Sequence, residues 1–568
     1  MLVNTKSYKN LNFIKLKTCA AIMPMLQPIE EISKKIGIRE SELILYGKYK
    51  AKVRLDILKR IKGRKNGKLI LVTTINPTFE GEGKTTVTIG LAQALAKMGK
   101  KVCLAIREPS IAPLMGAKGG GTGGGRSKVE PSQDINMHFT GDKYAVSIAH
   151  NLLSALIDNH IFYGNSLGID SRYILWPRVI DIGDRNLRNV VVGLGGAKDG
   201  VPREERFSIT AASEIMAILC LSEGIEEMKE KIGRIIVAYS RDGEPIRAEK
   251  FKAVGAMAAL LKEAIMPNLV QTTENVPAFV HGGPFANIAH GSSSLISAKI
   301  GLKLADYFIT EAGFGTDLGA EKFFDIVCRH NLKPDIAIIV VSLKSLKWHG
   351  GMSIEDVKRK KSTKAVKKGL ENLEKHVENI QIFGLPMIVA LNKFKEDSDE
   401  EIKIVEKFCK EREIPFGIAE VYEEGGEGGI ELAGKVIDTI YNNKPKFRFL
   451  YENDLSVKEK IEVIAEKIYG AEKVVYTLPA EDDIRKINKI GLNEMQVCIA
   501  KTPYSLSDDA SLRGRPRNFK ITVKEVRLSA GAGFLVPVTG KITTMPGLPL
   551  KPSAENIDVD DKGNIIGI

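Results

Sequence analysis

The chain has 568 residues, enough for roughly three or four domains, and its 43% hydrophobic and 27% charged residues are ordinary for a globular protein. No apolar run reaches the ~18–20 residues that cross a bilayer, so we expect a soluble, cytoplasmic protein with no membrane partner. The net charge of +13 favours anionic ligands, but the densest basic cluster, 358–368, has no interleaved aromatic residues, so we expect no nucleic-acid partner. The six cysteines are scattered without a CxxC pair, which predicts neither a zinc site nor a redox dithiol.

The first part of the chain, residues 1–25, carries lysines and no acidic residue. We expect a disordered extension here, or a start codon upstream of a true start at Met23 or Met25. A targeting peptide is the alternative, but its apolar stretch is weak and the lysines run through the whole segment instead of preceding it.

The segments that follow predict a βαβ unit. Residues 28–63 read as helices, because apolar residues recur there at helical spacing. Residues 69–75 form a continuous apolar, β-branched run, the pattern of a buried parallel strand, and 101–106 form the next such run. A glycine-rich loop and a helix ending at Gly99 lie between the two strands.

The glycine-rich loop is the first candidate binding site. It consists of Thr78, Phe79, Glu80, Gly81, Glu82, Gly83, Lys84, Thr85 and Thr86. This resembles the phosphate-binding pattern GxxxxGK[ST], with Thr78 in place of the first glycine. Gly81 and Gly83 let the backbone turn its N–H groups inward, and the helix start adds a positive dipole end. Lys84 can then reach the β- and γ-phosphates of ATP, and the Thr85 hydroxyl can bind Mg²⁺.

The sequence allows two other interpretations of this loop. One is a plain glycine turn between strand and helix, which would bind nothing. The other is a GTP site, because GTPases read guanine with an NKxD motif. Residues 392–395 read Asn-Lys-Phe-Lys, so Lys395 stands at the Asp position and the sequence favours ATP.

Alternating strands and helices continue along the chain. Further buried strands are predicted at 190–192, 234–239, 337–341 and 386–391, with helices between them, for instance at 209–222 and 251–264. This alternation predicts an α/β fold whose large phosphate-loop domain, residues 26–370, has a mostly parallel sheet. Two smaller α/β domains are expected at 371–470 and 471–568. From about residue 455 we expect helices to about 490 and then short strands such as 521–526.

Several segments together carry a family resemblance. They are Arg-Glu-Pro-Ser at 107–110, the glycine-rich segment 116–125, Asp-Ile-Asn-Met-His-Phe-Thr-Gly-Asp at 134–142, Leu-Ile-Asp-Asn-His at 156–160, Phe-Val-His-Gly-Gly-Pro-Phe-Ala-Asn-Ile-Ala-His-Gly at 279–291, Glu-Ala-Gly-Phe-Gly at 311–315 and Lys-Thr-Pro-Tyr-Ser-Leu-Ser-Asp-Asp at 501–509. From about Ile29 to its end the chain resembles the formate–tetrahydrofolate ligase family.

The resemblance implies a reaction in which formate, ATP and tetrahydrofolate give 10-formyltetrahydrofolate, ADP and phosphate through formyl phosphate. It implies Mg-ATP, a monovalent activator (K⁺ or NH₄⁺) and a homotetramer. Lys84 and Arg107 would be catalytic, Lys84 at the γ-phosphate and Arg107 on formyl phosphate. The folate site, with a contribution from 371–470, would be formed by Phe394, Tyr422, Glu108 and Asp142.

Alternatives remain open for these residues. Arg107 could pair with Glu108 or Asp142, and Glu108 could orient the pterin, hold the monovalent cation or pair with a lysine. Phe394 and Tyr422 could be core aromatics instead of a pair that sandwiches the folate rings. Segment 116–125, with seven glycines, could be a linker or could allow close backbone approach to a ligand or subunit.

The chain departs from the family pattern at particular positions. Tyr422 replaces the usual folate-stacking tryptophan, Arg126 replaces a tyrosine, and 344–347 read Lys-Ser-Leu-Lys in place of Arg-Ala-Leu-Lys. Four histidines lack the spacing of metal ligands, and we interpret them as structural or as hydrogen-bonding to substrate. They are His138, His281, His290 and His349. Competing classes are a partitioning or assembly ATPase and a basic RNA-binding protein.

Overall fold

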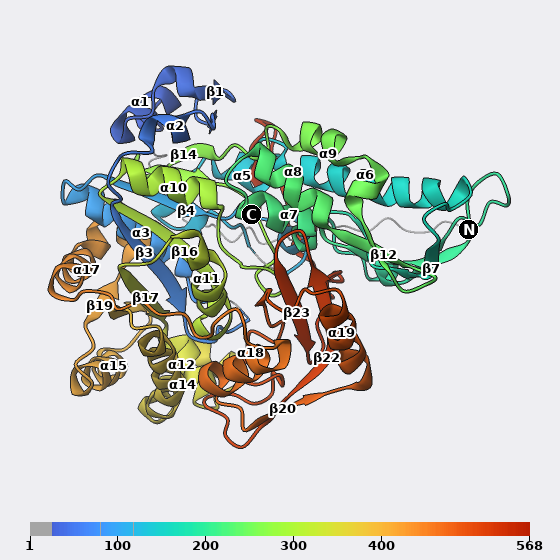
Figure 1. Cartoon of the computed structure of the whole chain (residues 1–568). Coiled ribbons are helices and arrows are strands. Elements are labelled where there is room, and N and C mark those ends of the chain that lie inside the picture. Colours follow the sequence, from blue (N-terminus) through green and yellow to red (C-terminus); the bar gives the residue numbers. More distant parts are fainter. Residues whose placement is uncertain (1–24, 80, 118, 568) are drawn as a thin grey trace, which may run out of the picture.

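The computed structural model describes residues 25–79, 81–117 and 119–567, and a twelve-stranded sheet forms its centre (Figure 1). In order across the sheet the strands are β1 (Leu43–Leu45), β2 (Ala51–Val53), β14 (Asn268–Thr272), β15 (Pro277–Val280), β4 (Val102–Ile106), β16 (Tyr307–Gly315), β3 (Lys68–Thr74), β17 (Ile336–Val341), β18 (Met387–Asn392) and β19 (Phe416–Ala419). At one edge β6 (Ser127–Glu130) pairs with β14, and β5 (Gly123–Gly124) pairs with β6.

Most of this sheet is parallel. Every neighbouring pair from β15 to β19 runs parallel, whereas β1, β2, β14 and β15 pair antiparallel with one another. The predicted α/β class with a mostly parallel sheet is therefore confirmed.

A hydrophobic core covers each face of the sheet. Successive side chains along a strand point to opposite faces, and in the central strands both sets are apolar. In β3, Ile70 and Val72 belong to one hydrophobic core, and Leu69 and Leu71 belong to the other. The first core contains side chains of α3 (Lys84–Lys97) and α17 (Ile430–Asn442). The second contains side chains of the helices α10 (Leu295–Leu304), α12 (Leu343–His349), α14 (Thr363–Ile382) and α15 (Asp399–Glu411).

Two smaller parts extend from the sheet (Figure 1). One contains the helices α6 (Asp142–Phe162), α7 (Glu214–Leu221), α8 (Ile225–Arg234) and α9 (Val254–Leu261) and the strands β7 (Ile169–Ile174), β12 (Ile236–Ser240) and β13 (Pro245–Arg247). We call it the α6 lobe. The other, the C-terminal sheet, consists of β20 (Lys473–Tyr476), β22 (Lys520–Ser529), β23 (Phe534–Thr539) and β21 (Gln496–Val497), with α18 (Val457–Val463) and α19 (Leu478–Lys489) beside it.

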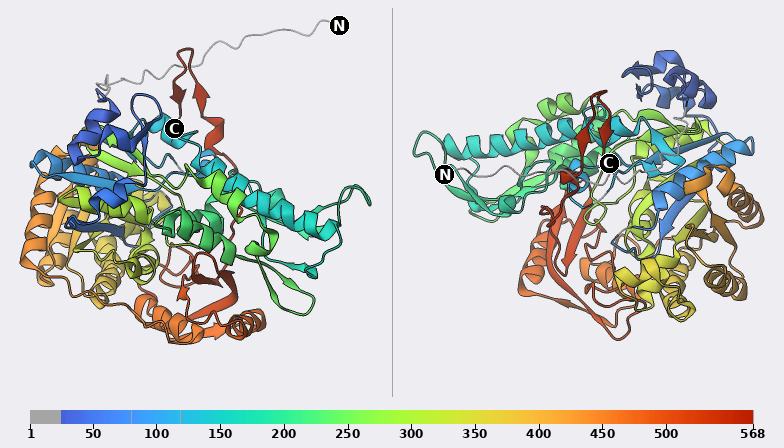
Figure 2. Two further views of the ribbon diagram at one scale, coloured as in Figure 1. Left: turned by 45° about the horizontal axis from the view of Figure 1, so that its top comes forward. Right: turned by 180° about the vertical axis from the view of Figure 1, so that it is seen from behind.

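After β23 the chain runs back to α5 (Ser132–Asn136), beside which the hairpin of β24 (Asp558–Val559) and β25 (Ile565–Ile566) lies (Figure 2). The Ser553 amide donates to the Gly116 carbonyl oxygen (2.6 Å), and Gln133 Nε2 donates to the Ile565 carbonyl oxygen (3.1 Å). The large sheet runs without interruption from β17 to β18 across residue 370. The domain boundaries at 370 and 470 stay a prediction. Within the described ranges, no helix has the length and apolarity to cross a membrane.

Four predicted elements were wrong or incomplete. Residues 28–63 hold α1 (Ile29–Ile36) and α2 (Ile57–Ile61), but the β1–β2 hairpin separates them, because β2 pairs with β14. The strand β9 (Val190–Val192) pairs with β10 (Arg203–Glu205) outside the large sheet and is not a buried strand. The predicted strand 234–239 is β12, which pairs with β7 and β13 in a separate sheet. β20 interrupts the helices expected up to residue 490, because it pairs with β22.

Candidate active site

Part of the predicted site lies along three adjacent strands, β4, β16 and β3, whereas Phe394 and Tyr422 follow β18 and β19. Loop 78–86 follows β3, Arg107 and Glu108 follow β4, and Glu311 lies in β16. Ligands of open α/β sheets bind at the carboxyl ends of the strands, because the connecting loops and helix N-termini converge there. Glu80 lies outside the described residues.

Glycine is required at one position of loop 78–86 by both backbone and space. Gly83 has φ +69°, and a Cβ atom there would lie 2.2 Å from Asn392 Nδ2. Asn392, at the end of β18, donates from Nδ2 to the Glu82 carbonyl oxygen (3.0 Å). The neighbouring strand therefore fixes the loop immediately before α3 begins.

The Glu82 side chain supports the loop from inside. It is buried, its Oε1 accepts from the Thr78 amide (2.8 Å), and its Oε2 accepts from the Ser342 hydroxyl. Burial raises the pKa of Glu82 although these hydrogen bonds oppose the shift. Phe79 is 58% exposed and packs against the Tyr504 ring with a centroid distance of 4.4 Å. Thr78 and Glu82 thus hydrogen-bond to each other, and Phe79 lies at the surface.

The start of α3 presents backbone donors and two side chains. Among the described residues no side chain caps this helix. Lys84 Nζ lies 3.3 Å from Glu311 Oε2, and the Thr85 hydroxyl donates to the same oxygen (2.8 Å). Burial alone would raise the pKa of Glu311, but the charges of Lys84 and Arg107 and the two hydrogen bonds lower it. Uncapped N–H groups beside a cation can hold an anion, and ionised Glu311 with Thr85 can supply oxygen ligands to Mg²⁺.

Arg107 has a buried donor without a hydrogen-bond partner among the described residues. Its Nη1 donates to the Pro284 carbonyl oxygen (3.2 Å), while Nε is buried without a hydrogen-bond partner in the described chain. Burial lowers the pKa of Arg107, and Glu311 opposes that shift. In the described chain Arg107 forms no ion pair with Glu108 or Asp142. A buried, partly unsatisfied guanidinium is suited to a carboxylate or an acyl phosphate.

His290 is a second buried group without partners near Arg107. Its side chain is fully buried, and neither ring nitrogen has a hydrogen-bond partner in the described chain. Burial lowers the pKa of His290 to about 3, and Arg107 adds to the shift, so the ring is neutral. A neutral imidazole offers one donor and one acceptor to a ligand.

Glu108 and Asp142 lie in a buried group of charges. Lys52 Nζ lies 2.7 Å from Asp142 Oδ1, and Asn268 Nδ2 donates to Asp142 Oδ2 (2.8 Å). Lys143 Nζ lies 3.8 Å from Glu108 Oε1 and makes no hydrogen bond to the described residues. Burial raises the pKa of Glu108 to about 7, although Lys143 opposes the shift. Asp142 therefore uses both its oxygens within the protein, whereas Glu108 does not.

Phe394 and Tyr422 follow β18 and β19, and neither is a fully buried core residue. Phe394 is half-buried, and Lys344 Nζ lies 4.2 Å from its ring centroid. Tyr422, in the short helix α16 (Val421–Glu424), is 46% exposed. Its ring packs on the glycine-rich segment: a Cβ atom on Gly124 would lie 2.8 Å from Tyr422 Cε2. Part of segment 116–125 therefore allows close backbone approach to this tyrosine.

The remaining histidines have structural or surface positions. His281 hydrogen-bonds to Ser294 (2.6 Å) and to the Ala264 carbonyl oxygen (2.7 Å), and His349 bonds to the Asn76 carbonyl oxygen (2.8 Å). His138 is exposed. Among the described residues no group of three or more His, Cys, Asp or Glu side chains is placed to hold a metal ion.

Sequence reasoning did not assign a site role to Glu311, although Glu311 contacts both Lys84 and Thr85. A charged residue inside an apolar strand was the signal that could have identified it, because such a side chain needs a buried partner. Asn392 was considered only as part of a guanine motif, and its role as a support of the loop depends on a contact that the sequence does not display.

The comparison with protein families agrees with this geometry over nearly the whole chain. The family model described as formate--tetrahydrofolate ligase matches residues 18–568. The chain therefore belongs to the formate–tetrahydrofolate ligase family, whose members join formate to tetrahydrofolate in ATP-dependent one-carbon metabolism.

Proposed function

We propose that this chain makes 10-formyltetrahydrofolate from formate, ATP and tetrahydrofolate, with formyl phosphate as the intermediate. A formate oxygen attacks the γ-phosphorus, the bond to the β-phosphate oxygen breaks, and ADP leaves. The folate N10 then attacks the formyl carbon, phosphate leaves, and N10 loses its proton. Phosphorylation is needed because free formate has only oxide as a leaving group.

The contact between the α3 N-terminus and Glu311 supports the placement of ATP. Loop 78–86 is proposed as the ATP site, with the uncapped N–H groups of α3 and the Lys84 ammonium facing the phosphates. Thr85 and Glu311 would hold Mg²⁺, because their oxygens suit this ion, and the ion would neutralise phosphate charge. Lys84 must then exchange its contact with Glu311 for one with the nucleotide.

The unpartnered Nε of Arg107 is the single observation that most directly supports an acyl phosphate site. The Arg107 guanidinium can bind the formate carboxylate before phosphoryl transfer and the phosphate oxygens afterwards. Both groups present negatively charged oxygens that accept its paired N–H donors. His290, whose ring nitrogens have no partner among the described residues, is proposed to hydrogen-bond the same ligand.

Phe394 and Tyr422 are proposed to bind the aromatic rings of tetrahydrofolate. Both rings keep exposed surface, which a core aromatic would not. Glu108 and Asp142 are proposed to lie at the pterin end, with Glu108 free to accept a hydrogen bond. Glu108 is also proposed to hold the monovalent cation, because burial raises the pKa of its carboxyl group and a cation beside it would stabilise the ionised form.

A direct assay tests the proposal. Purified protein with Mg-ATP, formate and tetrahydrofolate should form 10-formyltetrahydrofolate, and omission of any substrate should stop both product formation and ADP release. ATP hydrolysis that is independent of formate and folate would favour a partitioning or assembly ATPase instead. RNA binding with a steep salt dependence would favour the RNA-binding class. The homotetramer that the resemblance implies is testable by light scattering on the same sample.

A further inference from the structure

Lys143, the second residue of α6, is a lysine whose charged end is buried beside Glu108. The residue is 9% exposed, and its Nζ is buried without a hydrogen-bond partner in the described chain. Glu108 Oε1 lies 3.8 Å from this nitrogen, and Asp181 Oδ2 lies 4.0 Å from it. Both distances are too long for a hydrogen bond but short enough for attraction between opposite charges, so the two carboxylates hold the ammonium group through charge alone.

The surroundings of Lys143 oppose a positive charge in two ways. The residue lies in the first turn of α6, where the positive end of the helix dipole repels a cation. Burial also removes the ammonium group from water, which is costly for a charge without hydrogen bonds. The negative charges of Glu108 and Asp181 must therefore offset both effects, which ties the position of the ammonium group to these two residues.

Of these two carboxylates, Asp181 is already engaged elsewhere. Its Oδ1 accepts from the Ser110 hydroxyl and its Oδ2 accepts from the Ile111 amide (3.1 Å), at the start of α4 (Ile111–Met115). Glu108 is therefore the carboxylate that the Lys143 ammonium group can approach. A lysine side chain has a flexible four-carbon stem, and a shift of about 1 Å would shorten the contact to hydrogen-bond length.

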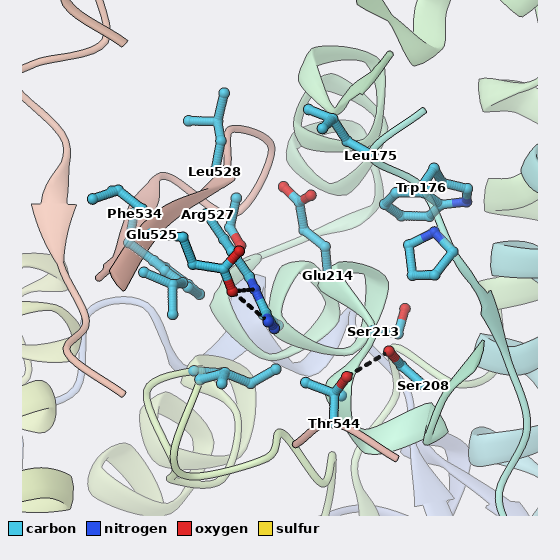
Figure 3. A pocket seen from close by; sticks show the side chains of 18 of the residues that line it. Leu175, Trp176, Ser208, Ser213, Glu214, Glu525, Arg527, Leu528, Phe534 and Thr544 are labelled. Carbon is cyan, nitrogen blue, oxygen red and sulfur yellow. Dashed lines mark hydrogen bonds and ion pairs between the residues drawn. The ribbon is translucent and has the colours of Figure 1, made fainter. Parts of the chain in front are cut away.

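Another buried carboxyl group, that of Glu214, shows the contrast. Glu214 lines a cavity of about 310 Å³ between the α6 lobe and the C-terminal sheet, and neither Glu108 nor Lys143 lines that cavity (Figure 3). Its Oε1 accepts from the amides of Gly531 (2.7 Å) and Ala532 (3.1 Å). Backbone amides thus satisfy Glu214, whereas the group that faces Glu108 is a cation.

We propose that the Lys143 ammonium group competes with the monovalent cation for Glu108, so that this chain needs little or no added K⁺ or NH₄⁺. The inference rests on the proposed function, in which Glu108 holds such a cation. The end of a lysine side chain carries the same single charge as K⁺ and the same kind of N–H donors as NH₄⁺. Because it is tethered beside Glu108, it has a high effective concentration there and outcompetes a free ion.

The test compares the wild type with Lys143→Met, which keeps the length of the side chain and removes its charge. Formation of 10-formyltetrahydrofolate is measured at equal ionic strength in tetramethylammonium chloride and in KCl, with all substrates as tetramethylammonium salts. Wild-type turnover should differ by less than about twofold between the two salts. The variant should lose about tenfold in tetramethylammonium chloride and recover most of it in KCl. Lys231→Met removes a buried lysine of α8 that pairs with Glu227 (2.8 Å), and this matched control should respond to K⁺ as the wild type does.

Thermal unfolding without substrates gives a second measurement that does not depend on turnover. KCl should raise the Tm of Lys143→Met above its value in tetramethylammonium chloride, because the ion binds only the folded chain, and should leave the wild-type Tm unchanged. Adding Glu108→Gln to the variant should abolish this rise.

A wild type whose turnover depends strongly on K⁺ would overturn the proposal, as would a Lys143→Met variant whose turnover and Tm do not respond to K⁺. If the wild type forms no 10-formyltetrahydrofolate in either salt, the proposed function is wrong, and the Tm comparison still decides whether Lys143 and K⁺ compete for Glu108.

Discussion

Replacing Tyr422 by alanine should weaken tetrahydrofolate binding without affecting ATP or formate. The side chain is 46% exposed. For a ring that buries ~200 Å², this leaves about 90 Å² for a ligand to cover, or ~2 kcal/mol at ~25 cal/mol per Å². Because ~1.4 kcal/mol is tenfold, the KM for tetrahydrofolate should rise about thirtyfold. Steady-state kinetics with each substrate varied in turn measures this, and Tyr422→Trp should keep or tighten folate binding.

The buried side of the same ring packs on Gly124 and Gly125, so alanine also removes a packing contact. Tyr144→Ala, on an exposed tyrosine of α6, is a control for removing a surface aromatic. Tyr422→Ala should therefore lower Tm slightly and the folate affinity strongly. A variant with a lower Tm but unchanged KM values for all three substrates would show that Tyr422 acts only as packing, and the stacking role would have to be abandoned.

Four further changes test other parts of the site. Lys84→Ala should nearly abolish turnover with the Tm close to that of wild type; near-normal activity would remove loop 78–86 as the ATP site. Arg107→Lys keeps the charge but loses the two-pronged donor, so ATP synthesis from formyl phosphate and ADP should fall severely, and wild-type rates would contradict its role. Glu311→Gln should raise the Mg²⁺ concentration for half-maximal turnover about tenfold, whereas an unchanged requirement would separate Glu311 from the metal. Glu214, with its pKa raised to about 7, binds more protons folded than unfolded between about pH 4.5 and 7, so it makes stability fall as pH rises through that window. Glu214→Gln should reduce this fall in urea titrations at pH 5 and 8, and an unchanged pH dependence would refute the shift.

Local pattern was sufficient for the strands that lie in the middle of the sheet. β3, β4, β17 and β18 are continuous apolar runs buried on both faces, and each was predicted within about two residues. β2 could not be found in this way, because Ala51–Val53 becomes a strand only through its pairing with β14, more than two hundred residues away. The position of β20 was missed for the same reason, because its partner β22 comes only after α19 and β21 in the chain.

The loop residues were predicted from their spacing, since a glycine-rich turn before a helix has a sequence signature. Contacts between distant segments have no such sequence signature. The sequence offered Glu311 as part of a motif, but only the neighbouring positions of β16 and β3 place its carboxylate against Lys84 and Thr85. Likewise Arg107 was chosen for its chemistry, and its unpartnered Nε became visible only with the burial around it.

The entry to loop 78–86 depends on a buried polar network that reaches the C-terminal part of the chain. Asn76 donates from its amide to His376 Nε2 (3.0 Å) and from Nδ2 to Asp317 Oδ2 (3.0 Å), and its carbonyl oxygen bonds to His349 (2.8 Å). Asp317 in turn pairs with Lys501 at 2.6 Å, and both side chains are fully buried. Removing one partner of a buried ion pair typically costs ~3–5 kcal/mol, so this geometry is strongly held. Lys501, more than four hundred residues after the loop, thereby helps to fix where the loop begins. The Lys-Thr-Pro-Tyr-Ser segment thus supports the glycine-rich loop through Asp317 and Asn76.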